Sequence, residues 1–566
     1  MRAPQAGLAK NFGELHMGLA DLFRSLKAAG SRTEKGVSVD LEEALPAEEP
    51  ASLTDAHING DRQLEQVEQL LKSGKFDHVL YCNQLDTPLG PEEAVLHYLE
   101  HGERAGLKAS FDFDAAYYLA RNEDLVHVDN LFLHYVNHGH HEGRKAHPFP
   151  GVVEGLRKLD PKRETVVLVL HETSRSGAPI LGWNICTHLR RDLSYNVVVI
   201  SLRGGGDLEN LFRGDASFFV APNSTELMQA DQIEWMSAII AQVAQPKYAI
   251  VNCAEAHSFG TSLKSMGVPV VALIHEFATY FSPANDFERF YSDVDAVVFS
   301  ADLVRKSSAE KFPILKTRER VLIIPQGVSL VPPDGHASRL VAPGLSSAGE
   351  LLRWRSVPAD FNVIGIGAVG WRKGVDLFVG VAAILKAQYP NVRAQFAWVG
   401  GRLPNYEEIA GYLAEQIKRA NVADTVVFLP ETADLRGFYE NANAFLLSSR
   451  LDPLPNVAID AMTLGIPVVC FDEASGIAEL LKTQNDLNFL VVPYLDVSSA
   501  AGVLAKLALN RELLESTKTA TMKIARERFD MRSYVAKLDC LGSHAAVANK
   551  GNGELAEGIT KPTRQS

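Results

Sequence analysis

The sequence lacks the features that mark several protein classes. Its five cysteines are scattered over 566 residues and include no Cys-x-x-Cys pair. This spacing argues against a disulfide framework or a zinc site and favours reduced thiols in a cytoplasm. An excess of positive charge is also absent, because 56 Lys and Arg stand against 69 Asp and Glu and the formal net charge is −13. A general nucleic-acid-binding protein is usually basic, so we expect no nucleic-acid partner.

Long apolar runs are missing as well. No stretch approaches the run of about 18 apolar residues that a membrane-spanning helix needs. The first residues contain no uninterrupted apolar region, which argues against a secretory signal. We therefore expect a cytoplasmic protein without a transmembrane segment, and peripheral association with the inner face of a membrane stays open. With 46% hydrophobic residues, the chain can still bury sizeable cores.

The N-terminal part of the chain predicts two segments. In residues 1–60, Leu and Phe recur at helical spacing near the start, which indicates an amphipathic helix, and a linker-like composition follows. Residues 61–150 contain an internal repeat, because the pattern that begins at Phe76 recurs at Phe113 with an offset of 37 residues. Each copy predicts two short helices, the second ending at a glycine. We interpret the repeats as an interaction module for a protein partner.

The second copy is rich in histidine, which raises the question of a metal site. Two of its histidines, His134 and His138, match His97 and His101 of the first copy. They belong to the pattern that both copies share, whereas the neighbouring histidines of the second copy have no counterpart in the first. A metal site needs ligands that converge, and this distribution does not predict one.

From residue 160 onward, short β-rich runs alternate with helical segments. Near-continuous apolar runs of this kind predict parallel sheets that are buried on both faces. The expected strands are 165–170, 196–201, 248–253, 270–275, 296–300, 361–367, 394–400, 425–430, 444–449 and 467–471. A segment rich in Pro, Gly and Ser separates two halves, residues 160–340 and 345–540. The expected fold class is α/β, with two Rossmann-like doubly wound domains facing a cleft after a small all-α repeat module.

The last part of the chain, residues 541–566, lacks apolar periodicity. Segments of this composition seldom bury enough apolar surface to offset the entropy of ordering the chain. We therefore expect this tail to be disordered.

The segment GIGAVGWRKGVDLFV places Arg372 and Lys373 in a glycine-flanked turn between an expected strand and an expected helix. Two adjacent cations at the carboxyl end of a parallel strand suit a diphosphate, because guanidinium and ammonium groups engage different oxygens. A pair of solvated surface cations is the alternative interpretation.

The segment SSRLDPLPNVAIDAMTLGIPVV carries Asp452 and Asp460 on either side of a loop that contains two prolines. After Pro455, the amides of Asn456 and Val457 would be free at a helix N-terminus, which is a site for anions. Carboxylates at such a place suit the hydroxyls of a sugar or a ribose. A turn-forming Asp452 and a helix-capping Asp460 are the alternative.

Taken together, these two segments resemble the donor domain of retaining GT-B glycosyltransferases of family four, the glycosyl transferases group 1. The family's E-x7-E motif and its following AMA-G-PVV correspond to D-PLPNVAI-D-AMTLGIPVV, and its Lys-Gly-(Val)-Asp turn corresponds to RKGVD. The resemblance covers about residues 165–535. The N-terminal repeats are similar to repeats found beside glycosyltransferase modules in bacterial surface-polysaccharide proteins.

The resemblance implies a role for each candidate residue. Arg372 and Lys373 would hold the donor diphosphate and stabilise the leaving nucleotide. Asp460 would bind the ribose hydroxyls, and Asp452 would bind the donor sugar near the reacting ring. The backbone of residues 455–457 would line the sugar and phosphate site. Both acids are Asp where the family usually has Glu, which shortens their reach and leaves the sugar and the base open.

The first half contributes candidates through the same resemblance. Gly177 is similar to the glycine of the family's first loop, which lets the backbone approach the donor phosphate. His275 matches the family's residue at the reacting centre, with a satisfied histidine at a strand end as the alternative. Glu276 and His257 are weaker candidates, for contact with the acceptor and the donor sugar respectively.

No metal and no other cofactor is expected, because members of the family need none. Asp293 and Asp295 spell a D-x-D sequence, but they directly precede an expected strand, a position that is structural in the family. The donor is expected to be a nucleotide-diphosphate sugar of UDP or GDP type, and the acceptor a glycan or a lipid-linked acceptor.

The expected activity is metal-independent, retaining transfer of a hexose, in bacterial surface polysaccharide synthesis. In this reaction the nucleotide diphosphate leaves from the face on which the acceptor hydroxyl arrives, and preorganised charges stabilise the transition state. Two alternatives stay open: a nucleotide-sugar epimerase of GT-B-like fold and a catalytically silent GT-B scaffold protein.

Overall fold

The computed structural model describes residues 53–85, 87–149, 151–280, 284–331, 359–400, 406–432 and 434–559. The chain divides into two compact units, residues 1–66 and 67–566. In the first unit, the described residues belong to helix α2 (Leu53–Ser73), so the last part of the expected linker is helical. The amphipathic helix expected near the start of the chain lies outside the described residues, as does most of the Pro/Gly/Ser-rich segment between the halves.

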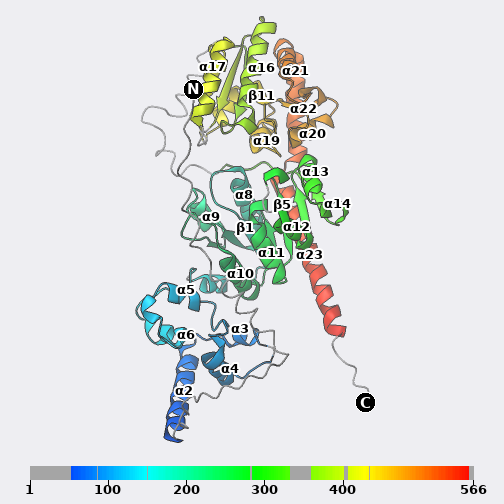
Figure 1. The fold of residues 1–566 in the computed structure, drawn as a ribbon. Coiled ribbons are helices and arrows are strands. Elements are labelled where there is room, and N and C mark those ends of the chain that lie inside the picture. Colours follow the sequence, from blue (N-terminus) through cyan, green and yellow to red (C-terminus); the bar gives the residue numbers. More distant parts are fainter. Residues whose placement is uncertain are drawn as a thin grey trace, which may run out of the picture. The chain divides into compact units, whose positions relative to one another are not determined.

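The repeat region is helical, and each copy contains the two expected pieces (Figure 1). The first copy consists of α3 (His78–Cys82), α4 (Pro91–His97) and the π-helical turn η1 (Tyr98–Gly102). The second consists of α5 (Ala115–Ala120), the short 3-10 turn η2 (Glu123–Leu125), α6 (Leu131–His134) and the π-helical turn η3 (Tyr135–Gly139). The glycine that ends the second piece is the last residue of each π-helical turn.

A tyrosine, a histidine and a glycine explain why the repeat pattern is shared by both copies. In the second copy, the Tyr118 hydroxyl lies 3.1 Å from Nδ1 of His134. A Cβ atom at Gly139 would overlap that hydroxyl, so only glycine fits there. The first copy repeats the arrangement, with the Tyr81 hydroxyl 2.6 Å from Nδ1 of His97. The shared histidines therefore take part in the packing of each copy.

The first Rossmann-like domain is built on a seven-stranded parallel sheet in the order β3-β2-β1-β4-β5-β6-β7. Its strands are β1 (Thr165–Leu170), β2 (Asn196–Ser201), β3 (Phe218–Val220), β4 (Tyr248–Val251), β5 (Val270–Ile274), β6 (Ala296–Phe299) and β7 (Val321–Ile323). Its helices are α7 (Val152–Arg157), α8 (Gly177–Arg191), α9 (Glu209–Asp215), α10 (Ala230–Ile239), α11 (His257–Ser265), α12 (Ala284–Asp293), α13 (Asp302–Lys311) and α14 (Ile314–Thr317). All five strands expected in this half are present.

Both faces of this sheet are buried, as its apolar strands predict. Along β1, Val167 and Val169 belong to one hydrophobic core, and Val166 and Leu168 belong to a second core on the opposite face. Successive side chains of a strand point to opposite faces, so an uninterrupted apolar run requires cover on both sides. The two strands that the sequence did not predict, β3 and β7, are only three residues long and lie at the edges of the sheet.

The second Rossmann-like domain contains a six-stranded parallel sheet in the order β10-β9-β8-β11-β12-β13. Its strands are β8 (Phe361–Ile366), β9 (Ala394–Val399), β10 (Val426–Leu429), β11 (Ala444–Leu447), β12 (Val468–Phe471) and β13 (Val491–Val492). Its helices are α16 (Val375–Gln388), α17 (Tyr406–Arg419), α18 (Arg436–Asn441), α19 (Asn456–Thr463), α20 (Gly476–Lys482), α21 (Val497–Leu509) and α22 (Arg511–Arg528). The five expected strands are present, and only the two-residue β13 was not predicted.

The strand order places the two charged segments of the second half at one point. Strands β8 and β11 are paired neighbours, although β9 and β10 lie between them in the chain. The chain order of the strands reverses there, and ligands of open α/β sheets bind outside the carboxyl ends of the strands at such a switch point. The Arg-Lys turn follows β8, and the aspartate-containing loop follows β11.

The disorder expected for residues 541–566 is wrong for most of that segment, because helix α23 (Met531–Ile559) continues through residue 559. Its Asp539 accepts hydrogen bonds of 2.8 Å from the hydroxyls of Tyr195 and Tyr248 in the first Rossmann-like domain. Ala545 is buried on the same helix. Alanine favours helix even without an apolar stripe, and packing on a distant part of the chain supplies the rest of the stability.

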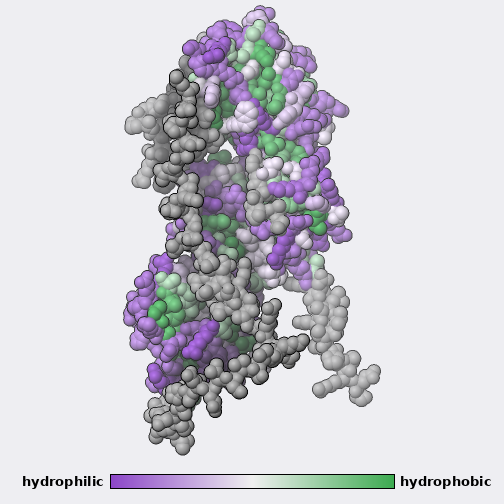
Figure 2. All heavy atoms as spheres, viewed as in Figure 1, coloured by the Kyte–Doolittle hydropathy of each residue, from purple (hydrophilic) through white to green (hydrophobic). Residues whose placement is uncertain are grey.

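None of the described helices is long and apolar enough to cross a bilayer. On the face seen in Figure 2, hydrophilic residues cover much of the described surface and hydrophobic residues form smaller patches between them.

Candidate donor site

The Arg-Lys turn between β8 and α16 is held by the chain segment that follows β11. The three main-chain carbonyls of the turn each accept a hydrogen bond from the segment after β11. The Arg450 guanidinium donates to the Trp371 carbonyl at 2.8 Å. The Arg450 amide donates to the Arg372 carbonyl at 2.9 Å, and the Ser448 hydroxyl donates to the Lys373 carbonyl at 3.1 Å. The backbone that carries both cations is therefore fixed against the neighbouring strand.

Gly374 ends this turn and precedes helix α16. Its φ angle is +64°, in the left-handed region that favours glycine. A Cβ atom at this position would also overlap the Ser448 carbonyl oxygen. Glycine is therefore required here both by the turn itself and by its close approach to the residue that follows β11.

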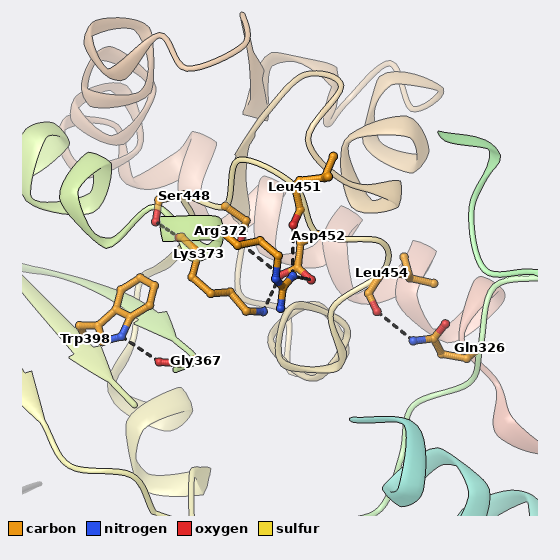
Figure 3. Close-up of polar contacts among 10 residues, drawn as sticks. Gln326, Gly367, Arg372, Lys373, Trp398, Ser448, Leu451, Asp452 and Leu454 are labelled. Atoms are coloured by element: carbon orange, nitrogen blue, oxygen red, sulfur yellow. Dashed lines mark hydrogen bonds and ion pairs between the residues drawn. The ribbon is translucent and has the colours of Figure 1, made fainter. Parts of the chain in front are cut away.

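The two cations converge on one carboxylate (Figure 3). Lys373 Nζ lies 2.6 Å from Asp452 Oδ2, and Arg372 Nη1 lies 2.9 Å from Asp452 Oδ1. The Ser449 hydroxyl donates to Oδ2 of the same carboxylate at 3.1 Å. Burial by itself raises the pKa of Asp452, but the charges of Lys373 and Arg372 outweigh it and hold the pKa below its ordinary value. Asp452 is therefore ionised at neutral pH.

This arrangement leaves one positive charge at the end of β8, because one carboxylate faces two cations. The Lys373 side chain is 17% exposed, whereas that of Arg372 is 43% exposed. The structure thus brings together three of the predicted site residues. Both oxygens of Asp452 bind protein groups, whereas the sequence predicted sugar hydroxyls as the partners of this residue.

The start of helix α19 offers main-chain donors beside these charges. The helix begins at Asn456, and its N-cap residue Pro455 makes no side-chain cap. In the part of the chain that the structure describes, the amides of Asn456 and Val457 have no hydrogen-bond acceptor in the protein. A helix N-terminus with free amides binds anions.

Asp460 lies one turn into helix α19, so the alternative of a helix-capping Asp460 is wrong. Burial raises the pKa of its carboxyl to about 7. The nearby Tyr439 hydroxyl donates to the Val457 carbonyl at 3.1 Å, and burial followed by the charge of Asp460 raises the pKa of Tyr439. Asp460 therefore carries a carboxyl whose charge changes near neutral pH.

Residues of the first Rossmann-like domain reach the same loop. Gln326, which follows β7, donates through Nε2 to the Leu454 carbonyl at 2.8 Å (Figure 3). The same nitrogen lies 3.1 Å from Asn456 Oδ1. The side-chain Nδ2 of Asn456 in turn lies 3.5 Å from the carbonyl of Gly177, the first residue of helix α8. The structure therefore brings Gly177 and Asn456 together, as two parts of one predicted site.

His275 follows strand β5 in the first sheet. Both of its ring nitrogens are buried, and neither has a hydrogen-bond partner among the described residues. The alternative of a satisfied histidine at a strand end is therefore wrong. Burial lowers the pKa of His275 to about 4, so the ring is neutral at pH 7. Buried polar atoms without a partner are rare in proteins, and a ligand is one explanation.

The two weaker candidates differ in their surroundings. The Glu276 carboxylate accepts from the amides of Ala254, at 3.3 Å, and His275, at 3.2 Å. Burial raises the pKa of Glu276 to about 7, and these hydrogen bonds oppose the shift. His257 lies with Nδ1 3.1 Å from the Ala254 carbonyl and with its ring 4.1 Å from that of Phe287. His257 therefore packs as part of the helix start.

The D-x-D acids bind protein cations. Asp295 lies 2.7 Å from the Lys264 ammonium and accepts from the Val270 amide at 2.8 Å. Asp293 lies 3.4 Å from the Arg289 guanidinium. Within the described ranges, no group of three or more His, Cys, Asp and Glu side chains is arranged to hold a metal ion.

Sequence reasoning missed three residues that build this site: Gln326, Arg450 and Asp376. Asp376 accepts hydrogen bonds from Nη1 and Nη2 of the Arg450 guanidinium, at 2.8 and 2.7 Å. Two of them could have been found from the sequence, because Arg450 stands two residues before Asp452 and Asp376 ends the RKGVD stretch. Gln326 gave no signal, since its partner is on a distant part of the chain.

Comparison with known proteins matches the second half of the chain to one family. Residues 355–523 match the family model described as glycosyl transferases group 1. Mannosylfructose-phosphate synthase from Agrobacterium fabrum is 31% identical over 25% of this chain and 32% of its own length. An uncharacterized glycosyltransferase from Haemophilus influenzae is 28% identical over 22% and 33%, respectively. The mannosyltransferase LpsB of lipopolysaccharide core biosynthesis, from Rhizobium meliloti, is 26% identical over 26% and 41%. The chain thus spans less than half the length of these relatives.

Two solved structures are similar over a larger part of the chain. Anabaena HepE in complex with UDP and glucose has a TM-score of 0.52 at 18% identity, over 66% of this chain and 98% of that chain. Sucrose-phosphate synthase from Thermosynechococcus elongatus has a TM-score of 0.52 at 16% identity, over 68% and 100%. This likeness confirms the expected GT-B fold of two Rossmann-like domains. Within that fold, residues 355–523 match the glycosyl transferases group 1.

Proposed function

We propose that the protein is a glycosyltransferase that moves a sugar from a nucleotide-diphosphate sugar to a glycan or lipid-linked acceptor. The observation that carries the proposal is the pair Arg372 and Lys373, fixed on Asp452 at the switch point of the second sheet. The family match covers this segment. HepE, a protein of the same fold, is described in complex with UDP and glucose, which supports a donor of this kind.

The proposed chemistry uses groups of this chain only. Arg372, Lys373 and the free amides at the start of α19 stabilise the diphosphate as it leaves. The neutral ring of His275 offers a hydrogen bond to the sugar or to the acceptor hydroxyl. The bond between the anomeric carbon and the diphosphate oxygen breaks, the acceptor oxygen bonds to that carbon on the same face, and the acceptor proton passes to the leaving diphosphate. The configuration at the sugar is thereby retained, and no metal is needed because protein cations carry the charge. Surface polysaccharide synthesis is the proposed setting, since one relative acts in lipopolysaccharide core biosynthesis.

Calorimetric titration with UDP-glucose and GDP-mannose tests the donor class. We expect one of them to bind, and Lys373→Ala to weaken that binding by about tenfold or more, which corresponds to about 1.4 kcal/mol. Lys482 is a matched control, because it pairs with Asp472 at 2.7 Å on the same domain but lies outside the proposed site. Lys482→Ala should leave binding unchanged. If neither these two nor other nucleotide sugars bind at millimolar concentration, the proposal fails and a silent scaffold becomes the better interpretation.

The reaction class has its own test. With a donor that binds, incubation with and without acceptor glycans separates a transferase from an epimerase, because only an epimerase changes the sugar without an acceptor. Proton NMR of the product reports whether the anomeric configuration is retained. Full activity in the presence of EDTA is expected, and loss of activity that Mg²⁺ or Mn²⁺ restores would overturn metal independence.

A further inference from the structure

A large aromatic side chain stands exposed beside the proposed diphosphate site. Trp371 immediately precedes Arg372, and 71% of its surface is accessible. Single exposed apolar residues are common and need no explanation by themselves. Trp371 differs from them because its ring is held in place by a charged partner.

That partner is Arg450. Its guanidinium lies 3.6 Å from the centroid of the Trp371 ring, a cation–π contact. Arg450 is itself fixed by the two hydrogen bonds to Asp376, and its side chain is only 14% exposed. One face of the indole ring thus rests on an immobilised planar cation, and the high exposure of Trp371 leaves the opposite face to solvent.

A second exposed aromatic residue is anchored to the same arginine. The Tyr494 hydroxyl donates to the Arg450 carbonyl at 3.1 Å, and Tyr494 is 50% exposed. We call Trp371, Arg450 and Tyr494 the aromatic platform. Hydrogen bonds to Asp376 and to the carbonyl of Trp371 hold the guanidinium of Arg450 in place before any ligand arrives.

We propose that the aromatic platform binds a pyranose ring of the acceptor glycan, an inference that rests on the proposed function. A sugar ring has an apolar C–H face that packs on an indole face, because the ring quadrupole attracts the slightly positive hydrogens. The hydroxyls at the edge of the sugar need polar partners, and the half-exposed Arg372 next to Trp371 is one. The next residue after Trp371 is Arg372, so the ring stands on the same short turn as the proposed diphosphate site.

A flat nucleobase also stacks on tryptophan, so the experiment must separate the acceptor from the base of the donor. The probes are p-nitrophenyl α- and β-glycosides of glucose, galactose and mannose, with maltopentaose as a longer glycan. Their binding to the full-length protein is measured by saturation-transfer NMR and titration, which need no turnover. UDP, UDP-glucose and GDP-mannose are titrated in parallel.

The informative variants are Trp371→Ala and Trp371→Phe. The control is Tyr412→Ala, because Tyr412 is 72% exposed on helix α17 and has no part in the platform. We expect Trp371→Ala to weaken binding of at least one glycoside by about tenfold, as the loss of an aromatic contact allows. Trp371→Phe and Tyr412→Ala should stay within about twofold of the wild-type protein, and nucleotide binding should not change.

Three results would overturn the inference. Equal glycoside affinity of the wild-type protein and Trp371→Ala would show that the ring does not bind sugar, as would a wild-type protein that binds none of the probes. Weaker binding of UDP or of the nucleotide sugars to Trp371→Ala would place the nucleobase on the ring instead. If the protein binds glycosides through Trp371 but binds no nucleotide, the platform is confirmed as a sugar-binding site and the proposed glycosyltransferase function fails.

Discussion

The ammonium of Lys373 lies 2.6 Å from the carboxylate of Asp452, a residue that is 5% exposed. Arg372 shares the same carboxylate at 2.9 Å. Two like charges on adjacent residues repel each other, and a buried counter-ion between them lowers that cost. Asp452 therefore holds both cations in one place and leaves a single net positive charge, which suits the diphosphate of the proposed donor.

The first prediction concerns Asp452. Asp452→Asn should lower the free energy of unfolding by about 1–3 kcal/mol, because it leaves the largely buried Lys373 without its counter-ion. Sugar transfer should be lost. Binding of UDP alone should persist, since both cations remain and a repelling negative charge is gone. Urea denaturation, calorimetry with UDP and a transfer assay measure the three effects. Loss of UDP binding in a folded Asp452→Asn protein would contradict the role of a counter-ion.

The second prediction concerns pH and Asp460. The pKa of its carboxyl is about 7 in the folded protein, above the ordinary value of 3.8. Between these two pH values the folded protein keeps a proton that the unfolded chain has lost. The contribution of Asp460 to the free energy of unfolding is therefore fully present at low pH and decreases as the pH rises from 3.8 to about 7. Asp460→Asn removes the titrating carboxyl. The free energy of unfolding of this variant, relative to that of the wild-type protein, should therefore rise from about pH 5 to about pH 8.

Urea denaturation of both proteins at the two pH values checks this. Other groups with a raised pKa, such as Glu276, titrate in both proteins and cancel in the comparison. A difference between the two proteins that does not change with pH would show that Asp460 has no raised pKa.

The third prediction concerns the turn that carries the cations. Gly374→Ala should cost at least about 2 kcal/mol, because alanine is strained at positive φ and its Cβ would overlap the Ser448 carbonyl. Donor binding should weaken as well, since the turn must move. Gly411→Ala is the matched control, because Gly411 lies inside helix α17 with open space around it. It should stabilise the protein by up to about 1 kcal/mol, and a similar loss in both variants would contradict the argument.

The fourth prediction concerns the repeats. Gly139→Ala should destabilise the repeat region, because the new Cβ would overlap the Tyr118 hydroxyl. Tyr118→Phe removes that hydroxyl, so the double variant should regain part of the stability that Gly139→Ala loses. Proteolysis of the repeat region and thermal unfolding measure the effect. Donor binding should be unchanged in all three variants, and strict additivity of the two changes would show that the two residues do not interact.

The sequence predicted the central strands of both sheets better than the elements at their edges. Long apolar runs such as 165–170 and 361–367 predicted central strands correctly, since a buried parallel strand is apolar along its whole length. The short edge strands and the helical tail were missed, because their structure depends on neighbours rather than on a local pattern. Asp539 of α23 shows this, since its tyrosine partners lie in the first domain.

The sequence by itself determined which residues are available for chemistry and which local structures carry them. Glycines flank the Arg-Lys turn, and prolines break the loop before α19; both effects are local properties of the backbone. Only the tertiary structure decided that Lys373 meets Asp452, that Arg450 lies under Trp371, and that the ring nitrogens of His275 are buried without a partner among the described residues. The physical reason is that strand order and burial arise from contacts between residues far apart in the chain. Those contacts set the charges, the pKa values and the free hydrogen-bonding groups of the site.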